Sequence, residues 1–339
     1  MARRSFGLGL SAAVAAAALV SGLSVQIAQA QWKPDKPITI IVPWAAGGST
    51  DQVTRLAAVE IEKALNQKVV IVNQGGASGS IGTKNAMSAP RDGYTWTAGA
   101  AKDIGTYVVS GLLDTKISDW RLYLSVINVS VLGVNPQLPY KSANDLIAAM
   151  KAKPGQISVA TAGVNSSGHA AIEAFTRALG LQYKHVTYDG GNPAVIAVVS
   201  GEAEVTTQLA VEQANMIRAK RLNALAVLSD RPLELDGYGT VPPITKDVPS
   251  YKPDANYFGI FVPKDVPAPV LAELDRIWTQ VIPNSEAMKK YAVANGAVFA
   301  PVHGDAAVKA AMPAISTTAW QLHAAGKSKV APDTVGIPK

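Results

Sequence analysis

The sequence of 339 residues contains no cysteine. Disulfide bonds, thiol catalysis, cysteine-ligated metals and a lipid anchor attached through cysteine are therefore excluded. A chain without disulfides must be stabilised by buried apolar surface, and this one is long enough to do so as two domains.

The sequence also lacks a block of basic residues. Lys and Arg number 31 against 25 Asp and Glu, which gives a formal net charge of +6. The basic residues are scattered and do not alternate with aromatic residues, so nucleic acid is not an expected partner. The mild positive balance fits an anionic small-molecule ligand, although solubility explains it equally well.

Long apolar runs are absent except at the N-terminus. There, Arg3 and Arg4 precede a mostly apolar stretch from Phe6 to Ile27, and Ala28-Gln29-Ala30 follows it. This order is typical of a secretory signal peptide with an A-x-A cleavage site. An uncleaved membrane anchor is the alternative, because the stretch is nearly long enough to span a bilayer. The small-residue site before polar Gln31 favours cleavage, and we expect a periplasmic protein of a Gram-negative cell that is not itself embedded in the membrane.

The residues 38–51 predict a strand, a turn and the start of a helix. Ile38–Val42 is a short β-branched run. Ala45–Gly48 has almost no side chains, so backbone N–H groups there can contact a ligand directly. Ser49 or Thr50 can cap the following helix. Unpaired N–H groups and the positive end of a helix dipole suit an anion, whereas the glycines can also serve the turn alone.

Two later turns repeat this arrangement. Residues 162–169 (AGVNSSGH) follow the predicted strand 157–161, and residues 188–193 (YDGGNP) follow the predicted strand 184–188. Alternating strands and helices predict an α/β protein with mostly parallel sheets. Two long β-type segments, near 126–134 and 257–262, would carry the chain to a second domain and back. A ligand would then lie in the cleft between the domains, at the strand ends. The chain after Met288 is predicted to be helical.

The motifs of several ligand and enzyme classes are missing. No Gly-Lys-Ser/Thr ends the first glycine turn as in a phosphate-binding loop, and its glycines lack the G-x-G-x-x-G spacing. The G-x-S-x-G elbow of hydrolases is absent as well. Ser166 and Ser167 lie too close to His169 in the chain to form a catalytic triad with it. We therefore expect no enzyme, no cofactor and no metal, and a secreted α/β hydrolase or transferase acting on an anionic substrate remains the alternative.

Six segments occur in the order and spacing of one known family: PDKPITIIVPWAAGGSTDQVTRL, NQGGASGSIG, DGYTW, AGVNSSGH, YDGGNPAV and YFGIFVPKDVPAPV. They resemble the periplasmic substrate-binding receptors of tripartite tricarboxylate transporters, the Bug-type (TctC-like) proteins. The resemblance implies a two-domain class II periplasmic-binding fold that closes on a carboxylate. It also implies delivery of that ligand to inner-membrane transporter subunits. Together with the turns of small residues, the resemblance predicts a receptor for a small organic dicarboxylate. Trp44 and Tyr188 would offer aromatic surface in the cleft, which would suit a dicarboxylate with an aromatic ring.

We expect residues 1–30 to form the signal peptide, 31–131 the first part of domain 1, 132–255 domain 2, and 256–339 the second part of domain 1 with the C-terminal helices. We also expect a monomer. Trp44 lines the cleft or packs as ordinary core. Asp51 is expected to order the Gly47-Gly48 turn, and His169 to hold the loop before it by a hydrogen bond. The candidate ligand-binding residues are Trp44, Ala45, Ala46, Gly47, Gly48, Ser49, Asp51, Ser80, Asn165, Ser166, Ser167, His169, Tyr188, Gly191, Asn192, Thr207 and Gln208.

The signal peptide can be tested directly. Because the A-x-A site ends at Ala30, protein recovered from the periplasm should begin at Gln31 when its intact mass is measured. Recovery of the full-length chain from the inner membrane would contradict this prediction.

Overall fold

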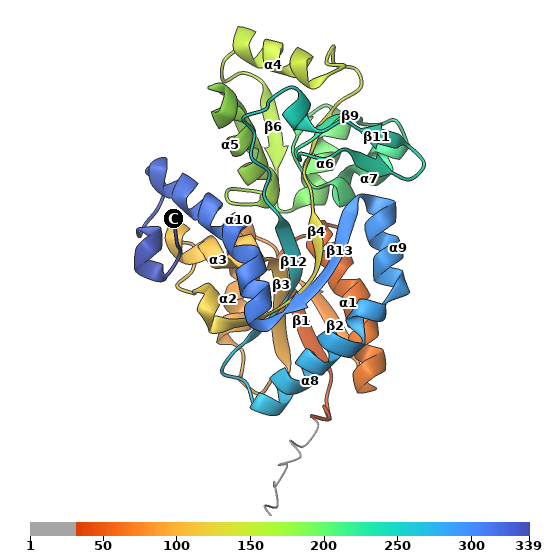
Figure 1. Ribbon diagram of the computed structural model, residues 1–339, viewed down its shortest axis with the longest axis vertical. Helices are drawn as coiled ribbons and strands as arrows, with labels where there is room; N and C mark the ends of the chain where they lie inside the picture. Colours follow the sequence, from red (N-terminus) through yellow and green to blue (C-terminus); the bar gives the residue numbers. More distant parts are fainter. Residues whose placement is uncertain (1–31) are drawn as a thin grey trace, which may run out of the picture. The chain divides into compact units, whose positions relative to one another are not determined.

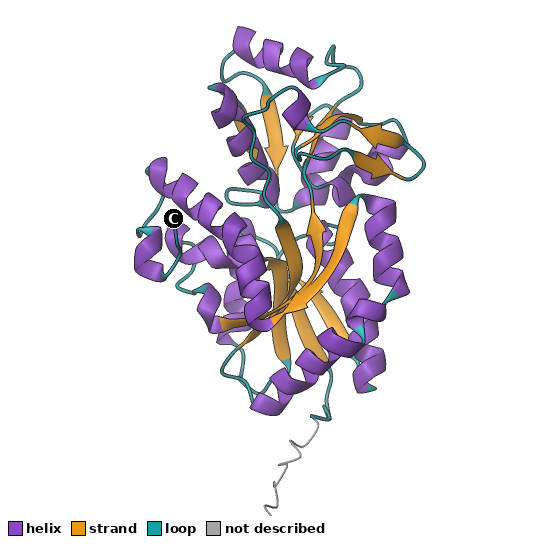
Figure 2. Cartoon of the chain, viewed as in Figure 1, coloured by secondary structure: helices purple, strands orange, loops and turns teal. Residues whose placement is uncertain are grey.

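The computed structural model describes residues 32–339, so the predicted signal peptide lies outside the described residues. These residues form two lobes, each built on a sheet with helices on both faces (Figures 1 and 2). Within this part of the chain, no helix combines the length and the apolar character that crossing a membrane requires.

The first lobe contains a six-stranded sheet in the order β13-β4-β12-β3-β1-β2. Its strands are β1 (Ile38–Val42), β2 (Val69–Asn73), β3 (Thr95–Ala100), β4 (Trp120–Asn128), β12 (Asn256–Pro263) and β13 (Ala297–His303). Its helices are α1 (Ser49–Leu65), α2 (Ser80–Ser88), α3 (Ala101–Ser110), α8 (Ala268–Gln280), α9 (Glu286–Asn295) and α10 (Gly304–Ala324). Short 3-10 turns occur at Ala77–Gly79, Ile117–Asp119, Ile282–Asn284 and Pro332–Val335.

The second lobe contains a five-stranded sheet in the order β7-β6-β8-β5-β9, and a separate two-stranded hairpin. Its strands are β5 (Val131–Val134), β6 (Ser158–Thr161), β7 (Lys184–Thr187), β8 (Val205–Thr206) and β9 (Asn223–Val227), with the hairpin formed by β10 (Leu233–Leu235) and β11 (Gly239–Val241). Its helices are α4 (Ala143–Ala152), α5 (Ser167–Leu179), α6 (Gly191–Ser200) and α7 (Ala210–Arg218), with a 3-10 turn at Ile244–Lys246.

The two sheets share one topology. In the first, β1 pairs in parallel with β2 and β3, and β12 lies antiparallel between β3 and β4. In the second, β6 pairs in parallel with β7 and β8, and β5 lies antiparallel between β8 and β9. In both sheets the central antiparallel strand is one through which the chain passes between lobes. The two-domain α/β fold agrees with the sequence prediction.

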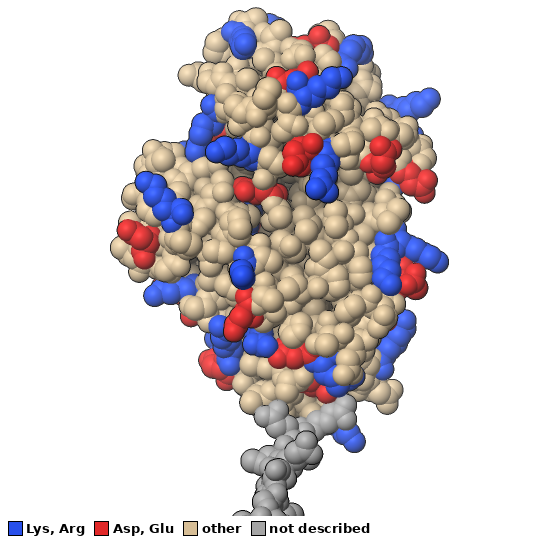
Figure 3. Space-filling model, viewed as in Figure 1, with Lys and Arg blue, Asp and Glu red and all other residues tan. Residues whose placement is uncertain are grey.

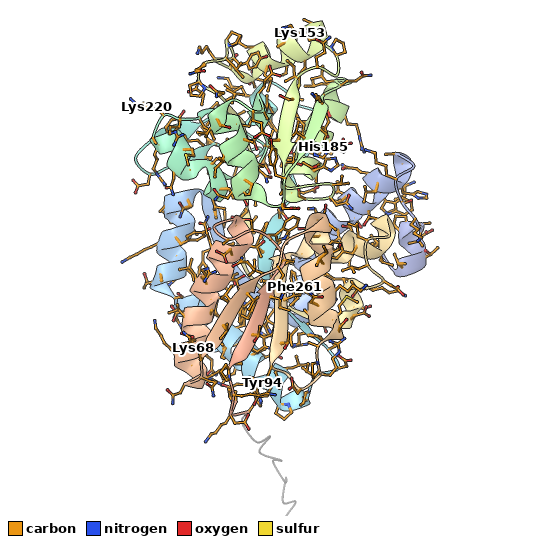
Figure 4. All side chains as sticks on the ribbon, turned by 180° about the vertical axis from the view of Figure 1, so that it is seen from behind. Lys68, Tyr94, Lys153, His185, Lys220 and Phe261 are labelled. Carbon is orange, nitrogen blue, oxygen red and sulfur yellow. The ribbon has the colours of Figure 1, made fainter. Side chains whose placement is uncertain are left out.

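Each sheet is buried on both faces, which is why its central strands are mostly apolar. In the first lobe, α1 and α8 cover one face around the fully buried Ile40 and Trp96, and α3 and α10 cover the other. Figure 4 shows Phe261 of β12 within this lobe, where its side chain is 2% exposed. In the second lobe, α4 and α5 cover one face and α6 and α7 the other.

Two sequence expectations were wrong in detail. The sheets are mixed, not mostly parallel, because the crossing strands β5 and β12 and their neighbours pair in antiparallel fashion. The chain after Met288 is not helical throughout: β13 separates α9 from α10 and pairs with β4. The predicted domain boundaries, after residues 131 and 255, lie at the start of β5 and just before β12, and they stay predictions.

A glycine lets the two crossing segments approach closely. Gly259 of β12 lies at an irregularity in its pairing with β4. A Cβ atom at this position would lie 2.1 Å from the carbonyl oxygen of Tyr123 and 2.6 Å from Cα of Leu124. Both atoms belong to the backbone, so neither can move aside without distorting β4.

We therefore expect Gly259→Ala to destabilise the protein by about 1–3 kcal/mol or more, as overpacking of a core does. Gly99 of β3, which pairs directly with Gly259, provides a matched control. A Cβ atom there would meet only the Phe261 ring, at 3.5 Å, so Gly99→Ala should leave stability nearly unchanged. Urea unfolding followed by circular dichroism measures both, and equal free energies of unfolding would contradict this packing argument.

Candidate functional site

A small cavity lies between the two lobes, at the ends of their parallel strands. Its volume is about 30 Å³, which is room for roughly two water molecules. Residues of both lobes line it: Trp44, Gly48, Ser49, Thr50, Asp103, Ala162, Ser166, Ser167, Gly191, Gln208, Leu209, Glu212 and Phe258.

Five helices direct their N-termini at this cavity. The helices α1, α3, α5, α6 and α7 each follow a strand of one of the two sheets, and residues from the first turn or the cap of each line the cavity. The first N–H groups of a helix have no partner within the helix, and the helix dipole places positive partial charge there. The cavity wall is therefore suited to an anion or to hydrogen-bond acceptors.

Asp51 fixes the turn that precedes α1. Its carboxylate accepts hydrogen bonds from the Gly47 N–H at 2.9 Å, the Asn73 amide at 3.0 Å and the Arg55 guanidinium at 2.9 Å. Burial raises the pKa of this carboxyl, but these hydrogen bonds outweigh burial and the pKa is lowered. Gly47 has a positive φ of 79°, which the turn requires and which glycine adopts without strain.

Hydrogen bonds join the lobes on both sides of the cavity. The Ser49 N–H of α1 donates to Oε1 of Glu212 in α7, at 3.0 Å. The buried Lys102 ammonium donates to the carbonyl oxygen of Asn165 and to Oδ1 of Asp103, both at 2.6 Å. An apolar cluster that combines Val53 and Phe258 with residues of α7 continues the contact. The described conformation is therefore a closed one.

The turn before α5 is held by its own side chains. Ser166 caps the helix and accepts from the His169 N–H at 3.3 Å. The His169 ring accepts from the Asn165 N–H at 3.3 Å and stacks on His185, with ring centroids 4.6 Å apart. Figure 4 shows His185 in the second lobe, where it lies on β7. The His169 ring thus orders the backbone of the loop.

The structure places the predicted residues in two groups. Trp44, Gly48, Ser49, Ser166, Ser167, Gly191 and Gln208 line the cavity. The others lie outside its wall in this conformation: Ala45, Ala46, Gly47, Asp51, Ser80, Asn165, His169, Tyr188, Asn192 and Thr207. Ala46 and Gly47 are exposed to solvent, and the Ser80 hydroxyl donates to the carbonyl of Ala77 within its own turn.

Six lining residues were missed by sequence reasoning: Thr50, Asp103, Ala162, Leu209, Glu212 and Phe258. Thr50 and Ala162 belong to turns that the sequence predicted, but neither was named as a ligand-binding residue. Asp103 and Glu212 carry no local signal, because each is an ordinary acidic residue in the first turn of a helix.

The two alternatives for Trp44 do not exclude each other in the structure. Its side chain is 7% exposed, belongs to the core of the first lobe and lines the cavity. Tyr188 instead packs against the core of the second lobe. The second aromatic side chain in the cavity wall is Phe258 of β12.

A second cavity of about 60 Å³ adjoins the first. Ser167 lines both, and Lys102, Asn128 and Asp254 contribute to the second. Neither the amide nitrogen nor the oxygen of buried Asn128 has a hydrogen-bond partner among residues 32–339. This cavity is therefore polar and can hold water or part of a ligand.

The burial of His169 has a consequence for stability at acid pH. Burial, followed by the neighbouring His185, lowers the pKa of His169 to about 4, whereas an unfolded histidine has a pKa of about 6.5. Only the unfolded chain then binds this proton between these two values, so stability is lost as the pH falls from about 6.5 to about 4. The difference corresponds to a loss on the order of 3 kcal/mol.

We expect His169→Asn, which keeps an acceptor for the Asn165 N–H, to reduce this pH dependence. Urea unfolding at pH 7, 6, 5 and 4 measures it. His323→Asn, at an exposed position of α10, is the control. Its free energy of unfolding should change with pH as that of the wild-type protein does. If the free energy of unfolding of the His169 variant fell with pH as steeply as that of the wild-type protein, the His169 imidazole would not be the cause of the loss.

Residues 53–312 match the model of the tripartite tricarboxylate transporter family receptor. Protein BugT of Bordetella pertussis is 28% identical over 267 residues, which cover 76% of this chain and 80% of BugT. The periplasmic binding protein BugD has a similar structure, with a TM-score of 0.79, 23% identity, and coverage of 87% of this chain and 99% of BugD. MatC of Rhodopseudomonas palustris, whose structure contains malate, has a TM-score of 0.77 and 22% identity over 85% of this chain and 99% of MatC. The chain belongs to the family of periplasmic solute-binding receptors of tripartite tricarboxylate transporters.

Proposed function

We propose that this protein captures a small organic carboxylate in the periplasm and delivers it to the inner-membrane subunits of a tripartite tricarboxylate-type transporter. The observation that carries the proposal is the convergence of five helix N-termini on one cavity between the lobes. Such N-termini bind carboxylates through backbone N–H groups and the helix dipole. Family membership supports a role as a receptor. We propose that the protein acts as a monomer after export.

The ligand class is supported by the site and by one neighbour. MatC contains malate, a dicarboxylate, and the cavity of this chain lies between residues of its two lobes. We propose that a ligand carboxylate lies against the N-termini of the helices that line the cavity. Trp44 and Phe258 offer aromatic surface there, which supports an aromatic dicarboxylate as a subclass.

The geometry of the serine and histidine side chains favours a receptor over a hydrolase. Ser166 is bonded to the backbone N–H of His169, and the histidine ring accepts from the backbone N–H of Asn165. Neither contact would activate a serine hydroxyl as a nucleophile. A receptor requires only binding and release.

Ligand entry requires the lobes to separate. Hydrogen bonds from Ser49 to Glu212 and from Lys102 to Asn165 join the lobes beside the cavity, and the lobes are connected by chain crossings next to β4 and β12, which can serve as a hinge. We propose that the lobes open to admit the ligand and close again around it.

A thermal-shift panel tests the proposed function. It should include aliphatic and aromatic mono-, di- and tricarboxylates, amino acids, sugars and metal cations. A carboxylate present at about 100 times its Kd should stabilise the protein by about 2.7 kcal/mol, and it should be recovered unchanged after prolonged incubation. Stabilisation by sugars or cations alone, or chemical conversion of the carboxylate, would contradict the proposal.

A further inference from the structure

The β10–β11 hairpin of the second lobe contacts the C-terminal end of α9 in the first lobe, and Figure 1 shows α9 and β11 on the same side of the two lobes. A Cβ atom at Gly296, the residue after α9, would lie 2.6 Å from Cδ1 of Leu233 and 3.0 Å from Cδ2 of Leu235. Both leucines are buried and belong to the core of the second lobe. These three residues join the lobes away from the ligand cavity, whose wall does not include them.

The Arg218 side chain connects the same two elements. It lies in the last turn of α7, where its guanidinium donates to Oδ1 of Asn215 at 3.0 Å. The guanidinium also donates to the carbonyl oxygen of Asp236 in the hairpin turn, at 2.6 Å, and to the carbonyl oxygen of Ala294 in α9. The last carbonyl groups of a helix have no partner within it and carry negative partial charge, which suits an arginine. Arg218 thus holds the hairpin turn and the end of α9 together.

The order of the strands places this contact beside the chain crossings. In the first sheet, β13 lies on one side of β4 and β12, and β3, β1 and β2 lie on the other. Asn128, the last residue of β4, pairs with Asn256 of β12 and with Ala297, the first residue of β13. The end of α9 is therefore level with the crossings, at about one strand spacing of roughly 5 Å from β4.

The hairpin leaves the second sheet at the same level. Val227, the last residue of β9, pairs with Val131, the first residue of β5. The next N–H group, of Leu228, donates to the carbonyl oxygen of Ser130 in the crossing, at 2.8 Å. In both sheets the strands β1, β3, β6 and β7, whose following helices line the ligand cavity, lie on the opposite side of the crossing strands. The contact between hairpin and α9 is therefore on the hinge side of the molecule.

A rotation about the crossings moves each atom in proportion to its distance from the axis. Contacts across the cavity, such as the bond from Ser49 to Glu212, separate when the lobes open, whereas a contact beside the axis can persist. We propose that the hairpin, Arg218 and the end of α9 form a pivot, which stays in contact in the open and closed conformations and guides the lobes along one rotation. This inference rests on the proposed function, because ligand capture requires the movement that the pivot guides.

Ligand affinity distinguishes a pivot from a latch that forms only on closure. An interaction of equal strength in two conformations cannot shift the equilibrium between them, so Arg218→Met should change the Kd by less than about twofold. The ligand is the carboxylate that gives the largest shift in the thermal panel, and titration calorimetry measures its Kd. If Arg218 were a latch, loss of its charged donor would weaken binding by about tenfold or more, and that result would overturn the inference.

Spin labels measure the movement directly, because a chain without cysteine accepts labels only at introduced cysteines. One double variant, Tyr238→Cys with Val293→Cys, spans the pivot from the hairpin turn to α9. These side chains are 42% and 73% exposed, so that labels there leave the packing intact. Pulsed electron resonance should give one narrow distance for this pair, unchanged by the ligand. This measurement leaves Arg218 in place and does not depend on whether the Arg218 variant folds.

A second labelled pair, Ile81→Cys with Val164→Cys, reports on the cleft. Both positions are exposed, and their loops meet across the lobes, since a Cβ atom at Gly163 would lie 2.8 Å from Oγ of Ser78. The ligand should shorten this distance. An equal change at the pivot pair, or binding without any change at the cleft pair, would overturn the inference and leave carboxylate binding standing.

The Arg218→Met change also tests the pivot without ligand. In the ligand-free protein it should broaden the distance distribution of the labels at 238 and 293. Arg221→Met, which changes an exposed arginine three residues later in the chain, is the control and should keep the wild-type distribution. An unchanged distribution in Arg218→Met would show that this side chain does not hold the two elements together. Failure of every carboxylate to bind would instead refute the proposed function.

Discussion

Helix N-termini that meet inside a protein need hydrogen-bond acceptors, and the site depends on this constraint. Each helix begins with N–H groups that have no partner within the helix, and burying them without acceptors costs free energy. The chain supplies some acceptors itself: Asp51 to Gly47, Ser166 to His169 and Glu212 to Ser49. The cavity is the place where the remaining donors and a ligand can meet.

The topology of the sheets brings these N-termini together. In each lobe a helix follows every strand of a three-strand parallel group, so the helices begin at one edge of the sheet. The chain passes between lobes next to β5 and β12, which lie in the middle of their sheets. The two helix-bearing edges consequently face each other. Acidic and basic side chains are interspersed on the face shown in Figure 3.

The closed conformation is held by a few contacts of different kinds. Leu209, which caps α7, and Val211 of α7 pack against Val53 and Phe258 of the first lobe. Beside them lie the hydrogen bond from Ser49 to Glu212 and the bond from Lys102 to the Asn165 carbonyl. These contacts are small compared with the two separate cores. Opening can therefore leave each lobe intact, as hinged closure around a ligand requires.

The sequence alone determined the features that are local. β-branched runs followed by small-residue turns indicated the strands and helix starts at α1, α5 and α6, because strand propensity, capping and turn geometry depend on neighbours in the chain. The family motifs lie in the same segments, so the fold and the receptor role could also be recognised. Six of the predicted residues that line the cavity belong to these turns, and the seventh, Gln208, lies between β8 and α7.

Tertiary structure decided what depends on distant segments. β13 was missed because its residues, AVFAPVH, form a strand through antiparallel pairing with β4, about 170 residues earlier in the chain. Glu212 looks like any acidic residue at the start of a helix. Only the packing of α7 against α1 and α6 buries its carboxylate between the lobes. Side chains that approach from the opposite lobe leave no pattern in the local sequence, because their environment is created by the fold.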